Sequence, residues 1–354
     1  MANNNNISNN NGGNYFPEEL ICDILSRLPV KSLLRFKSVS KTWRDLIQTR
    51  QFVKLHLKKS QEANSGGIIS LFSDTSRCNL NFHHSENPLA VELHSPTFLD
   101  YYKSRWNELG PPNLVGSCNG LLCFALPRDV YVLYNPSTRV FKTLPKVSRR
   151  RFYGFRVYSL FAYDNVNDDY KVFELFQYNV SYRSDNVVGV ESLIFSMKAN
   201  SWKTIDTDVP FHKNNFVVAN NCLRWVDREA TVVRSFNLVT ERYDEDICEI
   251  PTVISSTKGG IARMRGDFDI LVAEICDITE LVLWTTYCWT VFPVAACLKN
   301  RDSNPITKGE ESNLVLRGSD PEDGQVSGVR IPGFSEKGGS ITAKPWVESL
   351  VSLD

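Results

Sequence analysis

The sequence lacks an excess of charge of either sign: its 354 residues include 40 Lys or Arg and 40 Asp or Glu. Without a net charge, the chain has no overall field that would draw it to nucleic acid or to an anionic membrane surface. Hydrophobic residues make up 42% of the chain and aromatic residues 11%, a composition typical of a folded protein with a substantial core. We therefore expect a folded chain that binds neither nucleic acid nor membrane.

The sequence also lacks a disulfide framework, because its nine cysteines are odd in number and scattered without regular spacing. This usage favours reduced thiols. The first fourteen residues, MANNNNISNNNGGN, are rich in Asn and have no apolar stretch of the kind found in a secretory signal. We expect residues 1–14 to be disordered and the protein to act in the cytoplasm, the nucleus or both.

A long uncharged run occurs at residues 281–298, where a membrane span has to be considered. A transmembrane helix needs about 20 apolar residues, and this run is interrupted by Pro293. Its β-branched and aromatic residues favour buried strands. We predict strands here.

Patterns typical of metal and cofactor sites are missing as well. His83, His84 and His94 lie near Cys78 in the sequence, but their spacing fits no known zinc motif. Residues 164–169 lack the alternating ligands and the loop glycine of a calcium-binding EF-hand, so we predict a hairpin turn there. The sequence has no phosphate-binding Gly-rich loop, and we expect no cofactor and no metal ion.

One catalytic alternative stays open at Cys118. Gly116-x-Cys118-x-Gly120 has the form of a nucleophile elbow with cysteine in the serine position. Such an elbow leads into a helix, whereas residues 121–125 are predicted to form a strand, and the glycines also suit a turn with open backbone angles. No His or acid is placed to complete a triad. A cysteine hydrolase remains the alternative to a protein without catalytic activity.

The sequence does contain a compact helical unit at residues 15–59. Pro17 suits the start of a helix, and the acidic side chains after it favour the positive end of the helix dipole. Apolar residues then recur at helical spacing up to Pro29, which ends the helix. A short apolar run follows at residues 33–36, and Ser40 is placed to cap a third helix.

A unit this small is marginally stable alone, and its apolar faces are wider than short helices need to cover one another. The surplus either packs on the region behind it or docks on helices of another protein. The unit is also basic, with ten Lys or Arg against four Asp or Glu in residues 15–60. No helix joins these charges with base-reading Asn or Gln, which favours a solvated face beside an acidic partner over nucleic acid.

The order of residues in this unit closely resembles the F-box motif. The matching residues are Phe16-Pro17-x-x-Leu20, Ile24-Leu25, Arg27-Leu28-Pro29-Val30, Leu33-Leu34, Val39-Ser40-Lys41 and Trp43. The resemblance implies binding to a Skp-type adaptor and, through it, to the cullin of a Skp–cullin–F-box ubiquitin ligase. The adaptor contacts that it implies are Phe16, Pro17, Leu20, Ile24, Leu28, Pro29, Leu33, Leu34, Val39 and Trp43.

Behind the helical unit, the pattern is that of β-structure. An apolar strand, a polar turn and an aromatic or apolar return recur at LYNPSTRVFKTLP, FSMKANSWKTI, FNLVTERYDEDI and LWTTYCWTVFP. Phe141, Trp202, Tyr243 and Trp289 mark equivalent places in these units. A β-unit repeating every 40–50 residues or so is typical of propeller blades, and we prefer a propeller to a sandwich. The predicted fold is therefore α+β multidomain: a small all-α unit of three to four helices, then an all-β, propeller-like domain.

The β-region carries a second resemblance, to the F-box-associated domain of plant F-box proteins, of type 1 and kelch-like. The matching residues are Gly116-Ser117-Cys118-Asn119-Gly120-Leu121-Leu122-Cys123, Asn135-Pro136-Ser137-Thr138-Arg139, Ala162-Tyr163-Asp164, Asp168-Asp169-Tyr170-Lys171-Val172, Asn200-Ser201-Trp202, Leu223-Arg224-Trp225 and the closing residues 347–353. We expect the helical domain at residues 15–59, a connecting region with the first strands at 60–112, and the β-domain at 113–354.

Together the two resemblances imply a non-catalytic subunit that docks on a Skp-type adaptor and holds a target protein with its β-domain. The alternative is a scaffold that binds the adaptor without forming a ligase. Loops at one end of a propeller usually carry recognition, and the weak candidates for target binding are Arg149, Arg150 and Arg151, a basic cluster suited to an acidic or phosphorylated segment. A solvated loop is the simpler explanation of this cluster, and we prefer it.

Overall fold

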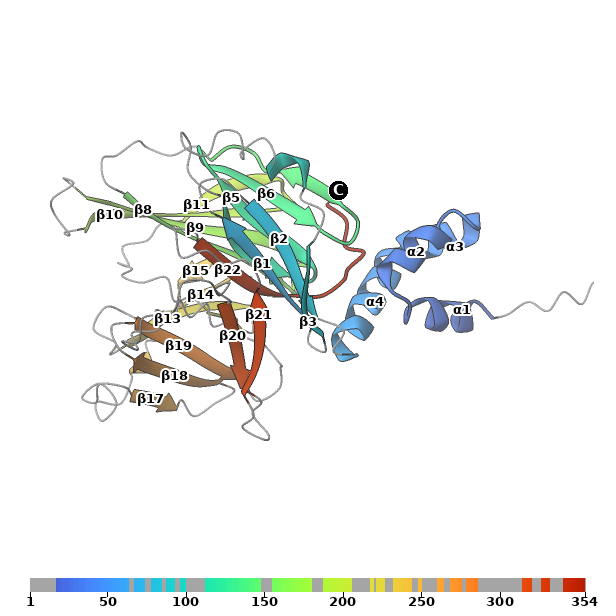
Figure 1. Ribbon diagram of the computed structural model, residues 1–354. Coiled ribbons are helices and arrows are strands. Elements are labelled where there is room, and N and C mark those ends of the chain that lie inside the picture. Colours follow the sequence, from blue (N-terminus) through green and yellow to red (C-terminus); the bar gives the residue numbers. More distant parts are fainter. Residues whose placement is uncertain are drawn as a thin grey trace, which may run out of the picture.

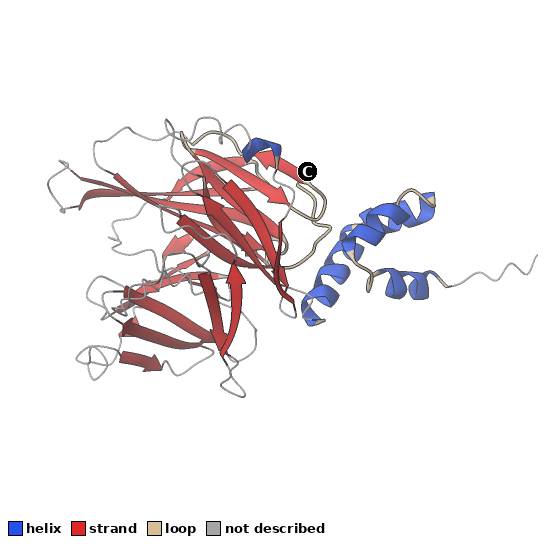
Figure 2. Cartoon of the chain, viewed as in Figure 1, coloured by secondary structure: helices blue, strands red, loops and turns tan. Residues whose placement is uncertain are grey.

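The computed structural model describes residues 17–63, 67–73, 78–84, 87–92, 96–99, 112–147, 155–179, 187–205, 217–219, 221–226, 232–243, 248–249, 260–263, 268–275, 278–285, 314–319, 326–331 and 340–353. The helices α1 to α4 form one part and antiparallel sheets form the other (Figures 1 and 2). The helical part lies against one side of the β-domain (Figure 1).

The helical unit consists of α1 (Glu18–Leu25), α2 (Val30–Phe36), α3 (Lys41–Gln48) and α4 (Arg50–Glu62). Pro17 and Pro29 are the residues just before α1 and α2, where a missing N–H costs nothing. Ser40 precedes α3 as expected, but its side chain makes no capping hydrogen bond. Thr49 caps α4, since its hydroxyl accepts a hydrogen bond from the Phe52 N–H.

The core of the helical unit includes a residue from the far end of the chain. Its buried members are Leu25, Val30, Leu33, Ile47, Phe52 and Leu350. Leu350 is about 300 positions away from the other five in sequence, yet packs with them. The short helices therefore do not cover one another completely and use a later segment to do so.

The strands of the β-domain form six sheets within the described residues. The first contains β1 (Gly67–Ser73), β2 (Cys78–His84), β3 (Asn87–Glu92) and β22 (Ser340–Trp346). The second contains β4 (Asn113–Cys118), β5 (Leu121–Leu126), β6 (Val130–Asn135) and β7 (Val140–Thr143). The third contains β8 (Phe155–Asp164), β9 (Asp169–Asn179), β10 (Val187–Ser196) and β11 (Ser201–Ile205).

The remaining sheets are smaller in the described part of the chain. The fourth contains β12 (Val217–Ala219), β13 (Cys222–Val226), β14 (Val232–Asn237), β15 (Arg242–Tyr243) and β16 (Cys248–Glu249). The fifth contains β17 (Gly260–Arg263), β18 (Phe268–Ile275) and β19 (Ile278–Thr285), and the sixth contains β20 (Leu314–Ser319) and β21 (Val326–Ile331).

The sheets follow one another in chain order, and β22 pairs with β1, so the first sheet takes strands from both ends of the domain. This is the arrangement of a propeller-like domain, and it confirms the predicted fold class. The boundary expected at residue 113 falls between the first and second sheets. Strands β1 to β3 precede this boundary and are nevertheless part of the β-domain.

The predicted hairpin repeat is present in three successive sheets. The register pairs Tyr134 with Phe141, Phe195 with Trp202, and Phe236 with Tyr243. Each turn places its last residue at positive φ, namely Arg139, Asn200 and Glu241. The fourth expected marker, Trp289, lies outside the described residues. The weaker copy at residues 314–331 forms the β20–β21 hairpin.

Candidate functional site: an open apolar face on the helical unit

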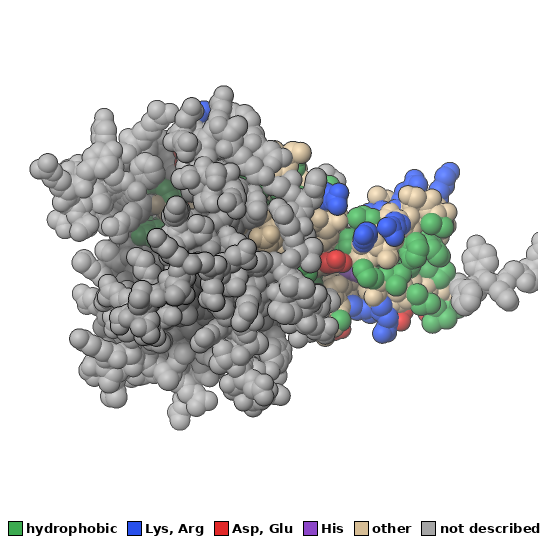
Figure 3. Space-filling view, viewed as in Figure 1, with side chains coloured by type: hydrophobic (Ala, Val, Ile, Leu, Met, Phe, Trp, Pro, Cys, Tyr) green, Lys and Arg blue, Asp and Glu red, His purple; other side chains and the backbone are tan. Residues whose placement is uncertain are grey.

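Three large apolar side chains of the helical unit are exposed. Leu20 is 53% exposed, Ile24 is 58% exposed and Val39 is 68% exposed. Leu20 and Ile24 are four residues apart in α1 and therefore share one face of that helix. Figure 3 shows hydrophobic side chains gathered on the helical unit, at its end away from the β-domain. The chain thus leaves apolar side chains of the helical unit uncovered, and we call the three exposed residues Leu20, Ile24 and Val39 together the apolar face.

Most of the other expected contact residues lie at or near the surface. Pro17 and Pro29 are exposed, and Leu28, Leu34 and Trp43 are half-buried. Phe16 lies outside the described residues.

Trp43 has a structural role besides any contact that it makes. Its ring lies 5.4 Å from that of Phe36 in an edge-to-face arrangement, which joins α3 to the end of α2. Leu28, Leu34 and Trp43 all pack against the buried cluster of the helical unit. Substitution of any of them would therefore disturb the fold as well as the surface.

The position of Leu33 contradicts its expected role as an adaptor contact. It is completely buried in the core of the helical unit, so its side chain has no surface to offer a partner. The resemblance to the F-box motif implied Leu33 as a contact, and the short apolar run at residues 33–36 does not by itself say which of its members face inward.

Basic side chains accompany the apolar face. Lys31 and Arg35 of α2 and Lys41 of α3 are exposed, and Figure 3 shows blue side chains beside the hydrophobic ones. Arg44 of α3 is held by a hydrogen bond from its Nε to the carbonyl oxygen of Lys37, at 2.9 Å. A partner on this side would meet an apolar patch with positive charge next to it.

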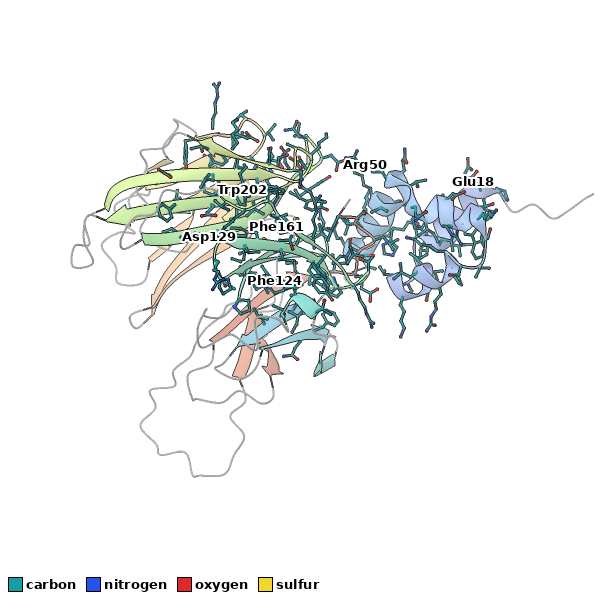
Figure 4. The ribbon with its side chains drawn as sticks, turned by 90° about the horizontal axis from the view of Figure 1, so that it is seen from above. Glu18, Arg50, Phe124, Asp129, Phe161 and Trp202 are labelled. Carbon is teal, nitrogen blue, oxygen red and sulfur yellow. The ribbon has the colours of Figure 1, made fainter. Side chains whose placement is uncertain are left out.

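The opposite side of the unit is anchored to the β-domain through α4. Arg50 and Lys54 both form ion pairs with Asp168, which lies in the β8–β9 turn. Figure 4 shows Arg50 on the side of the helices nearest the sheets and Glu18 at the far end. Further along α4, Gln61 Nε2 donates to Asn119 Oδ1 of the β4–β5 turn at 3.4 Å.

The pKa of the Asp168 carboxyl group is lowered at this contact. Burial alone would raise the pKa of its carboxyl group, but hydrogen bonds from Lys54 and Tyr163, together with the positive charges of Lys54 and Arg50, lower that pKa below its usual value. The carboxylate therefore stays charged and holds α4. Residues 164–169 form the hairpin turn that the sequence predicts, but nothing in the sequence predicts that this turn anchors a helix.

Cys118 does not have the surroundings of a nucleophile. It ends β4, and the chain turns through Asn119 and Gly120 directly into the strand β5, whereas a nucleophile elbow leads into a helix. Burial raises the pKa of the Cys118 thiol to about 12, so the reactive thiolate is scarce near neutral pH. The strand predicted at residues 121–125 is confirmed, and this geometry contradicts the elbow.

Other expectations fall partly outside the described residues. Arg149, Arg150 and Arg151 lie between β7 and β8 and are not described. Of the uncharged run at residues 281–298, the structure describes only 281–285, which belong to β19. Within the described part of the chain, no helix has the length and apolar character to cross a membrane. The same part contains no cluster of His, Cys, Asp or Glu suited to a metal ion.

Comparison with known protein families gives matches for both parts. Residues 15–55 match the F-box domain, and residues 68–285 match the F-box associated beta propeller domain FBA_3. The expectation of a type 1 domain was therefore wrong. The second match starts with β1, ahead of residue 113, and ends with β19.

Individual relatives agree with these matches. F-box protein At5g49610 of Arabidopsis thaliana is 32% identical over 302 residues, covering 80% of this chain and 79% of that protein. F-box protein CPR1 of the same plant is 29% identical over 291 residues, covering 75% of this chain and 67% of that protein. F-box/kelch-repeat protein At3g23880 is 27% identical over 281 residues, covering 73% and 71%.

Among solved structures, TolB from Acinetobacter baumannii is similar with a TM-score of 0.40 and 11% identity, over 85% of this chain and 73% of that one, which is too low to carry an argument. The domain match, by contrast, spans more than half of the chain, and it begins directly behind a matched F-box. The chain belongs to the family of F-box proteins that carry an F-box-associated β-propeller domain.

Proposed function

We propose that this chain is the substrate-recognition subunit of a Skp–cullin–F-box ubiquitin ligase. The observation that carries the proposal is the apolar face, where Leu20, Ile24 and Val39 are all more than half exposed. Apolar side chains exposed together on a small helical unit are typical of a surface that another protein covers. The F-box match supports a role in substrate recognition and suggests a Skp-type adaptor as that protein.

The surroundings of the apolar face suggest what the adaptor presents to it. An apolar groove would accept α1 in the manner of other helix-in-groove complexes. The exposed Lys31, Arg35 and Lys41 favour a partner with acidic residues beside this groove, because complementary charge speeds association and excludes wrong partners. The cullin would join through the adaptor.

The β-domain would hold the target protein, so that a ubiquitin-charged enzyme elsewhere in the complex reaches its lysines. The rate gain then comes from proximity, since a bound target meets the enzyme at a high effective concentration. In this mechanism the chain positions two proteins and itself makes or breaks no bond. Such a complex would work in the cytoplasm or the nucleus.

A capture experiment tests the docking surface. The full chain, co-expressed with a Skp-type adaptor, is compared with the variants Ile24→Asp and Val39→Asp. A matched control is Val166→Asp, because Val166 is as exposed as Val39, at 68%, but lies in the β8–β9 turn. We expect the first two variants to lose adaptor binding by at least roughly tenfold, since docking would bury an unpaired carboxylate, and the control to bind normally. Equal capture by all three variants would show that the face is not the docking surface.

Recovery of a cullin separates the ligase from an adaptor-binding scaffold. The wild-type complex is purified from cells through a tag on this chain, and the cullin is measured relative to the adaptor. A ligase subunit brings down adaptor and cullin together. Adaptor without cullin would favour the scaffold.

A further inference from the structure

Residues 347–353, which we call the C-terminal segment, run from the end of β22 between the helical unit and the second sheet. Figure 1 shows this red segment passing between the helices and the strands. Its apolar side chains point to both parts. Leu350 belongs to the buried cluster of the helical unit, whereas Leu353 is buried in the cluster of the second and third sheets, with Val351 packed against that cluster.

Hydrogen bonds fix the backbone of the segment to the β-domain. Asn135 Nδ2 donates to the carbonyl oxygens of Ser349, at 3.0 Å, and Val351, at 2.9 Å. The Ser349 N–H donates to Ser137 Oγ at 3.1 Å. Asn135 is the last residue of β6, and Ser137 lies in the turn that leads to β7. The segment is therefore seated on the β-domain by specific backbone bonds as well as by apolar contact.

The β4–β5 turn is shaped to admit the segment. Gly120 has a φ of +80°, and a Cβ built there would lie 2.2 Å from Ser349 Cβ and 2.6 Å from the Val347 carbonyl oxygen. No side chain fits in that space. Just before the segment, Trp346 Nε1 donates to the Gly120 carbonyl oxygen at 2.8 Å.

The segment also completes the helices. The Val30 N–H at the start of α2 donates to Glu348 Oε2 at 3.1 Å. The first N–H groups of a helix have no partner within it, and Pro29 before α2 has no side-chain group to cap them. Glu348 supplies the missing acceptor, and its negative charge suits this end of the helix dipole.

The ion pairs between the two parts are weaker. The ion pairs of Asp168 involve side chains of Arg50 and Lys54 that are 64% and 52% exposed. Exposed ion pairs contribute little to stability and are screened by salt. The buried Leu350 therefore makes the larger contribution to joining the helices to the sheets.

We propose that the C-terminal segment is the missing part of the helical unit: it completes the core beneath the apolar face and sets the orientation of that face on the β-domain. Because the segment directly follows β22, which closes the first sheet on β1, the helical unit reaches full stability only when the β-domain has closed. The consequence for adaptor docking rests on the proposed function, whereas the structural dependence does not.

Hydrogen exchange on the full chain, read by mass spectrometry, tests this dependence. The variants are Leu350→Ala, which removes the buried contact, and Gly120→Ala, which displaces the segment from the β-domain side. Thr204→Asp is the control, since Thr204 is exposed in β11, the edge strand of the third sheet. We expect amides of α1 to α4 to exchange roughly thirtyfold faster in Leu350→Ala, the effect typical of truncating a core leucine. Gly120→Ala should also accelerate them, and the control should not.

Hydrogen exchange of peptides from β9 and β10 reports, in the same experiment, whether the β-domain stays folded. If they stay protected in Leu350→Ala while the helices exchange faster, the segment supports the helical unit specifically. If helices and sheets accelerate equally, the variant is globally destabilised, and Glu348→Gln then decides. This milder change weakens only the bond to the Val30 N–H and should accelerate α2 alone. Unchanged helix exchange in Leu350→Ala, or in Glu348→Gln where that variant decides, overturns the proposal.

Adaptor capture with the same variants keeps the two proposals apart. Val39→Asp should lose the adaptor with its helices fully protected, because Val39 is exposed and outside the buried cluster. Leu350→Ala should weaken capture and helix protection together. Loss of protection in Leu350→Ala together with normal capture by Val39→Asp would support the segment and refute the docking face.

Discussion

Two apolar residues of the helical unit should respond in opposite ways to the same truncation. Leu33 is completely buried among Leu25, Val30, Ile47, Phe52 and Leu350, whereas Ile24 is 58% exposed. Leu33→Ala leaves a cavity in a small core that cannot collapse around it, and we expect a loss of about 2–5 kcal/mol of helical-unit stability. Ile24→Ala creates no cavity and replaces a β-branched residue with a better helix former, so stability should change by less than about 0.5 kcal/mol.

Adaptor docking should respond directly to Ile24→Ala and only indirectly to Leu33→Ala. Ile24→Ala removes a side chain that the adaptor would cover, and loss of one such contact typically costs about 1–2 kcal/mol, or roughly tenfold in affinity. Leu33→Ala should weaken docking only as far as it unfolds the helices. Adaptor added in excess should restore binding to Leu33→Ala by mass action, but not the intrinsic affinity of Ile24→Ala.

The measurement has to separate the helical unit from the β-domain. Tryptophan fluorescence does not, because the chain contains seven tryptophans, of which Trp43 is in α3 while Trp202 and Trp346 are in β-strands. Hydrogen exchange of α1 to α4 peptides at increasing urea gives their local stability, and titration calorimetry gives the adaptor affinity. If Ile24→Ala destabilises the helices as much as Leu33→Ala does, Ile24 is packed in solution and the apolar face is not open.

Three further outcomes are expected. Burial lowers the pKa of His56 below its ordinary value of 6.5, against the opposing effects of a backbone hydrogen bond and of Glu348. As the pH falls, the unfolded chain therefore protonates His56 before the folded chain does. The helical unit should lose stability as the pH falls below about 6.5 and keep it above. His56→Gln should abolish this dependence of stability on pH, measured by urea titrations at about pH 7.5 and 5.5. Lys171→Met should destabilise the third sheet by about 3–5 kcal/mol in the same titrations, because it leaves the buried Asp164 carboxylate without its cation; a smaller loss in Lys171→Met/Asp164→Asn would identify that charge as the cause. Cys118, whose thiol pKa is raised to about 12, should resist alkylation at about pH 8 in the folded chain, and rapid labelling there would contradict the raised pKa.

The sequence predicts those features that depend on neighbours along the chain. The helical unit follows from prolines at two helix starts and from apolar residues at helical spacing. The repeated hairpins follow from alternation around polar turns, and the register of Phe195 with Trp202 agrees with the predicted repeat. Each of these patterns needs only about a dozen residues to be recognised.

The junction between the two parts could not be predicted in the same way. Asp168 lies in a tight turn, and nothing in its neighbourhood indicates that α4, more than 100 residues earlier, supplies its cations. Glu348 and Leu350 lie in a short polar and apolar stretch that has no period of its own. A buried leucine in such a stretch gives no signal of which core it enters, because the choice depends on the closed tertiary structure.

The junction also indicates which end of the β-domain remains for the target. Turns facing the helices are short and bonded to their surroundings: Asn119 contacts α4, Asn135 holds the C-terminal segment, and Asn165 donates its backbone N–H to Asn221 of the next sheet. Antiparallel strands place alternate connections at opposite ends of a sheet, so the end of β7 and the start of β8 lie away from these turns. A surface already occupied by the helical unit is a poor place for a large target. For the target binding that we propose, residues 148–154, with Arg149 to Arg151, are the first segment to exchange with a relative.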